Sequence, residues 1–139
     1  MDKSIDEIMN SINGRHFILD GREIVPATLM EWGKWMESRG NVIIKQEVVG
    51  DCWVSTVFLG LNHSWDPDGP PILFETMVFE TGKDGKRDMS GIFQDRCTTY
   101  DEAEAVHAKA VAWVQDGCQD PGNIHDAIDT AIQSMRGRT

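Results

Sequence analysis

The chain has 139 residues and a formal net charge of −10 at neutral pH. Its length suits one domain with a real core, and its 40% hydrophobic residues and five tryptophans exclude a disordered chain. The acidic balance disfavours duplex nucleic acid as a partner, because duplex-binding proteins neutralise phosphates with clustered Lys and Arg.

The first 40 residues predict two helices around a β-hairpin. Residues 1–14 open with a capping box and then place isoleucines at helical spacing, which predicts an amphipathic helix. The dipeptide Asp20-Gly21 is typical of a two-residue hairpin turn. A second capping box, Thr28 with Glu31, predicts the start of another helix.

The middle of the chain predicts a β-sheet. Four strands are expected, at residues 42–49, 52–59, 72–80 and 89–97. Gly50-Asp51 joins the first two as a tight turn. A much longer polar and aromatic loop separates the second and third strands. A plain hairpin needs only about two to five linking residues, so this loop is either a binding element or an ordinary structured loop.

Two helices close the chain. The capping box of Thr99 and Glu102 opens a helix to about Asp116, and Asn123 is expected to cap a terminal amphipathic helix. The predicted fold class is α+β, an antiparallel sheet with helices packed on one face and amphipathic terminal helices. It forms one domain over residues 1–139, divided into an N-terminal helix (1–14), an α+β core (15–116) and a C-terminal helix (117–139). The terminal helices either thicken the core or form a homo-oligomer.

Catalysis and metal binding find little support in the sequence. His63, Asp66 and Asp68 could ligate a metal or exchange protons, but Asp-Pro-Asp-Gly is also ordinary turn chemistry, and structural zinc sites usually gather four His or Cys ligands. The chain has no G-x-S-x-G, no phosphate-binding G-x-x-x-x-G-K and no cysteine beside a histidine. We therefore expect no enzyme activity, metal or cofactor. His107, near the apolar face of its helix, is expected to be hydrogen-bonded and partly buried rather than catalytic.

The expected location is a cytoplasm. Three widely spaced cysteines without C-x-x-C indicate reduced thiols. No apolar run approaches the roughly 20 residues of a membrane span, and the N-terminus lacks the basic start and apolar stretch of a signal peptide. The sequence therefore predicts no membrane partner.

Arg96 is the strongest candidate for binding an anion. It lies at the end of a predicted strand, just before a predicted helix N-terminus, where unsatisfied N–H groups favour phosphate. The alternative is a surface pair between Asp95 and Arg96. Lys34 and Lys45 are weaker cationic candidates.

Four further residues are candidates for contacts with a nucleotide. Trp65 could stack on a base, or it could anchor its loop to the core. Phe74 and Thr76 share one face of their strand, where Phe74 could equally be a core residue. His63 and Thr76 would add polar contacts.

Residues 17–114 resemble a family of small, mostly uncharacterised bacteriophage and prophage proteins. The segments that carry the resemblance are ILDG (18–21), LMEWGKW (29–35), VSTVFLGL (54–61), PILFETMVF (71–79) and YDEAEA (100–105). This family is similar to phage proteins that counter Thoeris immunity by sequestering a cyclic ADP-ribose signal. Where members have an aromatic residue after the arginine, this chain has Cys97, so binding residues are not transferred by position.

The resemblance implies an anti-defence protein that acts as a sponge. It would bind a small anionic nucleotide signal without catalysis, as a homo-oligomer in the host cytoplasm, with Arg96, Trp65, His63, Phe74, Thr76 and Lys34 as the candidate ligand contacts. Two alternatives stay open. One is a protein-interaction module that inhibits a host defence enzyme through an acidic surface. The other is a small hydrolase that acts on a nucleotide signal.

Overall fold

The computed structural model describes residues 15–64, 68–82, 84–119 and 121–137. Trp65, Asp66 and the helix predicted over residues 1–14 lie outside these ranges. In chain order the described elements are β1 (Phe17–Asp20), β2 (Glu23–Pro26), α2 (Leu29–Met36), the 3₁₀ helix η1 (Arg39–Val42), β3 (Ile43–Val49), β4 (Cys52–Phe58), β5 (Phe74–Glu80), β6 (Phe93–Cys97), α3 (Tyr100–Gln115) and α4 (Pro121–Arg136).

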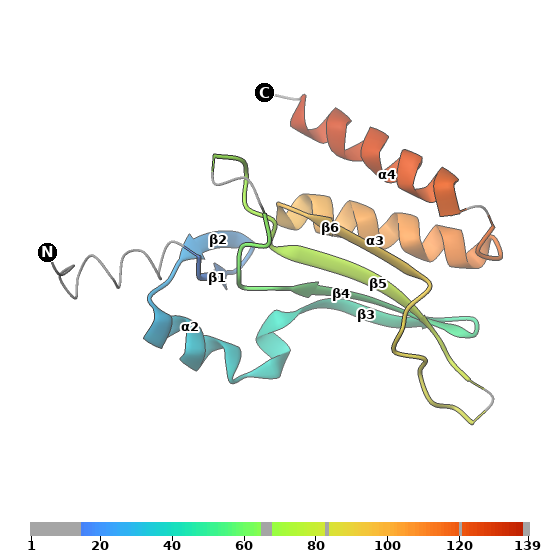
Figure 1. Ribbon diagram of the computed structural model, residues 1–139, viewed down its shortest axis with the longest axis horizontal. Coiled ribbons are helices and arrows are strands. Elements are labelled where there is room, and N and C mark those ends of the chain that lie inside the picture. The colour runs from blue at the N-terminus through green and yellow to red at the C-terminus, as the bar shows by residue number, and fades with distance from the viewer. Residues whose placement is uncertain (1–14, 65–67, 83, 120, 138–139) are drawn as a thin grey trace, which may run out of the picture.

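The strands form two antiparallel sheets. β1 and β2 pair as a small hairpin, and β3, β4, β5 and β6 follow one another across a four-stranded sheet. Both α3 and α4 lie on the same side of this sheet, and α3 packs directly on its strands (Figure 1). The predicted α+β fold, with an antiparallel sheet and packed helices, is therefore confirmed.

The boundaries of most predicted elements agree with the structure to within two residues, η1 was not predicted, and two boundaries differ by more. β6 begins at Phe93 rather than at Met89, because Gly91 has a φ of +73° and turns the chain before the strand. α4 begins at Pro121 rather than after Asn123, and proline is favoured at a first helical position because its missing N–H would be unpaired there.

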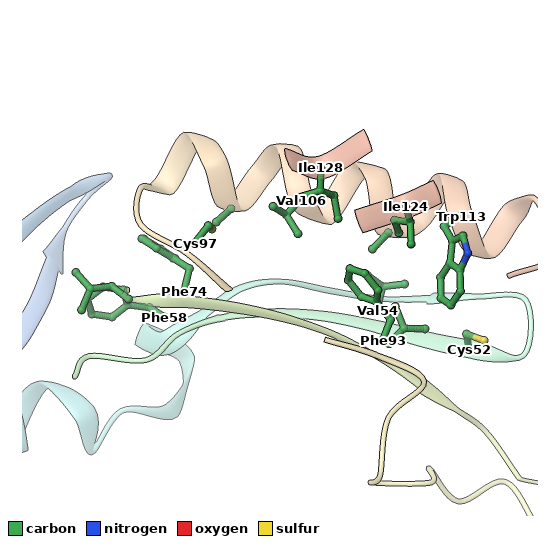
Figure 2. Close-up of a cluster of buried hydrophobic side chains, with 14 residues drawn as sticks. Cys52, Val54, Phe58, Phe74, Phe93, Cys97, Val106, Trp113, Ile124 and Ile128 are labelled. Atoms are coloured by element: carbon green, nitrogen blue, oxygen red, sulfur yellow. The ribbon is translucent and has the colours of Figure 1, made fainter. Parts of the chain in front are cut away.

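The core lies between the sheet and the two C-terminal helices. Alternate residues of each strand point toward α3, as a period of two requires, and meet one face of that helix. Ile124 and Ile128 of α4 belong to the same cluster and are 5% and 1% exposed, so this part of the apolar stripe of α4 covers the chain's own core (Figure 2). The main members of the core from the sheet and α3 are Val54, Phe58, Phe74, Val78, Phe93, Val106, Ala110 and Trp113.

A buried carboxylate joins the first turn of α3 to the end of α4. Glu102 completes the capping box with Thr99 and accepts hydrogen bonds from the guanidinium of Arg136 at 2.8 and 3.2 Å. Burial by itself would raise the pKa of Glu102, but Arg136 and the backbone N–H of Thr98 outweigh it and lower the pKa overall. The ionised pair therefore stabilises the docking of α4.

We expect Arg136→Ala to lower the free energy of unfolding by about 1–2 kcal/mol at pH 7. This loss is smaller than that expected for a fully buried ion pair, because solvent screens the half-exposed arginine. The pKa of Glu102 is lower in the folded protein than in the unfolded chain, where it is about 4.3. The ion pair therefore stabilises the fold fully above the unfolded pKa, and this stabilisation is lost as the pH falls through the lower folded pKa. Urea titrations at pH 7 and in acid should therefore show the difference between variant and wild type shrinking in acid. Arg39→Ala, an exposed arginine in η1, is the control. A difference that persists unchanged in acid would contradict this role.

Candidate functional site

A pocket of about 290 Å³ lies between α3 and the edge strand β3. Lys45 and Glu47 contribute polar walls from β3, while Tyr100, Glu104 and His107 contribute from α3. Gln115 and a set of small and aliphatic side chains complete the lining: Ile44, Ala108, Val111 and Ala112. The pocket therefore combines an apolar surface with a few charged and hydrogen-bonding groups, which is typical of a small-molecule site.

His107 is held in place by two buried hydroxyl groups. Its Nδ1 lies 2.7 Å from Oγ1 of Thr56, which lies 2.7 Å from Oγ1 of Thr76. The two threonines are direct partners in the antiparallel register of β4 and β5, so their side chains share the face that α3 covers. All three residues are almost fully buried. This network fixes the orientation of the imidazole.

The other nitrogen of His107 lies beside Glu47, which also lines the pocket. Nε2 is buried, lies 3.5 Å from Oε2 of Glu47 and forms no hydrogen bond with the described residues. An ionised carboxylate only accepts hydrogen bonds, so the favourable tautomer has its proton on Nε2. Nδ1 then accepts from the Thr56 hydroxyl, and Thr56 accepts from Thr76.

The pocket electrostatics favour a neutral imidazole. Burial lowers the pKa of His107, and the nearby Glu47 carboxylate opposes this effect without overcoming it. At neutral pH the site therefore offers one N–H donor beside a carboxylate acceptor. Glu104, at the same wall, is paired with Arg22, whose guanidinium also lies over the Tyr100 ring, 4.3 Å from its centroid.

The arrangement of hydroxyl, imidazole and carboxylate resembles a catalytic triad only in its residue types. In a triad the hydroxyl must reach a substrate, whereas Thr56 is 0% exposed and lies beneath α3 in a central strand. The buried thiols are also poor nucleophiles. Burial raises the pKa of Cys97 to about 12, and burial together with Cys118 raises the pKa of Cys52 to about 11.

Arg96 lies on the opposite face of the sheet from this pocket. It is the register partner of Glu75, and its Nε donates to Oε2 of Glu75 at 2.8 Å. Asp95 instead accepts a hydrogen bond from the backbone N–H of Arg96. The side-chain partner of Arg96 is therefore Glu75 rather than Asp95, because neighbouring residues of a strand point to opposite faces.

The other described candidates are spread over the molecule. Phe74 is 0% exposed and packs edge-on against Phe58 and Tyr100 within the core. His63 is exposed in its loop, and Lys34 is exposed on α2. Of the candidates within the described residues, Lys45 lines the pocket, and Thr76 is connected to it through Thr56 and His107.

Sequence reasoning missed Glu47, Tyr100 and the part played by Thr56. One signal for Thr56 was available. It lies between Val54 and Phe58 on the inward face of a predicted central strand, where a buried hydroxyl needs a hydrogen-bond partner. His107 was the inward polar residue on α3 that could supply one. The prediction that it is hydrogen-bonded is confirmed, and it is more deeply buried than the partly buried side chain expected.

Comparisons with known proteins do not assign this pocket. A scan against protein-family models finds no match, and searches of curated proteins and of solved structures find none either. Within the described residues, no helix combines the length and apolar character needed to cross a membrane, and no cluster of His, Cys, Asp and Glu is suited to a metal ion.

Proposed function

We propose that this protein binds a small molecule in the pocket between α3 and β3 and does not alter it. The observation that carries the proposal is the pair of His107 and Glu47 in the pocket wall, where Nε2 of His107 lies 3.5 Å from Oε2 of Glu47 and forms no hydrogen bond within the described residues. A buried polar group without a hydrogen bond costs about 1–3 kcal/mol, and the nearby carboxylate offsets part of that cost. A ligand acceptor that reached this N–H, after a small movement of the pocket wall, would recover the remainder.

The expected ligand carries a planar group with an acceptor beside a donor. His107 would donate to the acceptor, and Glu47, only 3.5 Å away, would accept from the donor. The edge of a nucleobase presents this pattern, and the aliphatic lining would contact its ring. Pockets for drug-sized ligands start at about 300 Å³, so this pocket suits one ring system better than a whole dinucleotide.

A cyclic ADP-ribose type of signal is one ligand that fits this proposal, because it contains a base. Its phosphates would have to remain at the mouth of the pocket, since Glu47 and Glu104 repel anions. Lys45, whose side chain is 62% exposed, is the cation among the described pocket residues that could reach them. Sequestration of an immune signal by a phage protein is the function that we propose on this basis.

The decisive experiment separates retention from turnover. The purified protein is incubated with cyclic ADP-ribose isomers and cyclic oligonucleotides, freed of unbound ligand and denatured, and the released material is identified by mass spectrometry. Release of an intact signal would support sequestration. An altered signal would contradict the absence of catalysis, and no retained signal would contradict the proposal for those nucleotides.

Glu47→Ala should weaken binding of the retained nucleotide by about 10–100-fold, the effect of losing one charged hydrogen bond worth about 1.5–3 kcal/mol. Isothermal titration calorimetry measures the change. Glu23→Ala, which removes an exposed carboxylate on β2, is the matched control and should bind normally.

Arg96→Ala discriminates between the two faces of the sheet. Loss of binding in that variant, with normal binding by Glu47→Ala, would place the ligand at Arg96 and overturn the pocket assignment.

A protein-interaction module is the second candidate, and the net charge of −10 favours it. Such a protein would inhibit a basic host enzyme by charge complementarity, with an association rate that falls steeply as salt is added. Inhibition of a defence enzyme in the absence of any nucleotide would support this candidate over sequestration.

A further inference from the structure

The outer edge of β3 is open to a further strand. β3 is the end strand of the four-stranded sheet and pairs with β4 alone among the described strands. Such an edge presents unpaired backbone N–H and C=O groups. It also exposes apolar side chains, since Val48 is 70% and Ile43 is 42% exposed.

The hairpin geometry indicates which backbone groups point outward. Val49 and Cys52 flank the two-residue turn and are register partners, so they form the hydrogen-bonded pair that closes the hairpin. Pairs then alternate along β3, so Glu47 and Lys45 direct their backbone groups toward β4. Gln46 and Val48 direct theirs away from it, toward the open edge.

We propose that the open edge binds the β3 strand of a second copy of this chain, in antiparallel orientation, across a two-fold axis at Gln46. The two Gln46 residues would then form a hydrogen-bonded backbone pair. Lys45 of each copy would lie directly opposite Glu47 of the other. The contact is isologous and joins two sheets into one of eight strands.

Charge complementarity selects this register over its neighbours. Opposite charges placed directly across two strands are stabilising, and like charges are destabilising. Moving the two-fold axis by one residue would place either Lys45 opposite Lys45 or Glu47 opposite Glu47. The register centred on Gln46 instead forms two Lys–Glu pairs. These pairs lie on the face that α3 covers, where Lys45 and Glu47 line the pocket.

The second copy would therefore bring a cation to the pocket. Glu47 already lies 3.4 Å from Nζ of Lys45 in its own strand. In the pair, Lys45 of the second copy would approach Glu47 from outside the sheet edge. Each pocket would then gain a positive charge that one chain cannot provide. The strand pairing itself does not depend on the proposed ligand.

Charge reversal tests the pairing by sedimentation velocity over a concentration series. Wild type should be a dimer that dissociates on dilution. Each single charge reversal, Lys45→Glu or Glu47→Lys, should raise the dimer dissociation constant by about tenfold or more. In a dimer of either variant, residues 45 and 47 would carry the same charge, so two like-charged pairs would lie across the interface. An equal mixture of the two variants should form a heterodimer, and the double variant should dimerise again.

Gln46→Pro supplies a test that does not depend on charge. Proline removes the central outward N–H, which the fold of one chain does not use, so the variant should fold and remain monomeric. Gln46→Ala should remain dimeric, and circular dichroism and thermal unfolding check that each variant is folded. A monomeric wild type would overturn the proposal. So would single charge reversals that still dimerise, or a mixture that gives no heterodimer.

Discussion

Replacing Phe74 with alanine should lower the free energy of unfolding by about 3–5 kcal/mol. The ring is fully buried in β5, and its centroid lies 5.2 Å from that of Phe58 and 6.0 Å from that of Tyr100. Truncation would leave a cavity between the sheet and the start of α3 and would remove two edge-on aromatic contacts. Urea-induced unfolding followed by circular dichroism measures the loss.

The size of this effect separates the two roles considered for Phe74. A core residue changes stability, whereas a residue that only contacts a ligand changes affinity and leaves the unfolding midpoint almost unchanged. Met30→Ala is the control, because Met30 is 80% exposed and its truncation should change stability by no more than about 0.5 kcal/mol. A loss below about 1 kcal/mol for Phe74→Ala would contradict the core role.

Replacing Gly60 with alanine should cost about 2–4 kcal/mol of stability, from a backbone contribution and a packing contribution. Gly60 has a φ of +76°, where residues with a side chain are strained. A Cβ atom there would lie 2.7 Å from Nε1 of Trp32 and 3.2 Å from Sδ of Met36. Both contacts come from α2, so the variant should displace this helix. Thermal unfolding and tryptophan fluorescence are the measurements.

Gly50→Ala is the matched control for this substitution. Gly50 has a φ of +58°, but a Cβ atom added there meets nothing within 4 Å. It should therefore lose only the backbone contribution, about 1–2 kcal/mol. The difference between the two variants measures the packing of α2 against Gly60. Equal losses would show that Trp32 and Met36 move aside at no cost.

Local sequence signals predicted the elements well because their interactions span only a few residues. The capping boxes of Thr28 with Glu31 and of Thr99 with Glu102 both form as expected. The tight turns after β1 and β3 also form, with positive φ at Gly21 and Gly50, but the first consists of Gly21 and Arg22 rather than of Asp20 and Gly21, because Asp20 pairs with Glu23. The order of these elements was sufficient to predict an α+β fold with an antiparallel sheet.

The candidate site could be predicted only in part. The position of His107 on its helix predicted a buried, hydrogen-bonded side chain, but its partner Thr56 lies 51 residues earlier. Arg96 was placed correctly at the end of a strand before a helix. Its side chain nevertheless lies across the sheet from the pocket and pairs with Glu75, which depends on the register between β5 and β6.

The sequence by itself determined the order of most helices and strands, which residues alternate toward the core, and that His107 would need a partner. Only the tertiary structure decided that Glu47 and His107 share a pocket, and that Arg96 and Phe74 do not face it. The physical reason is the separation along the chain between the residues that interact. Caps and turns are closed by neighbours in the chain, whereas the pocket exists because α3 crosses a sheet whose register sets which distant side chains meet.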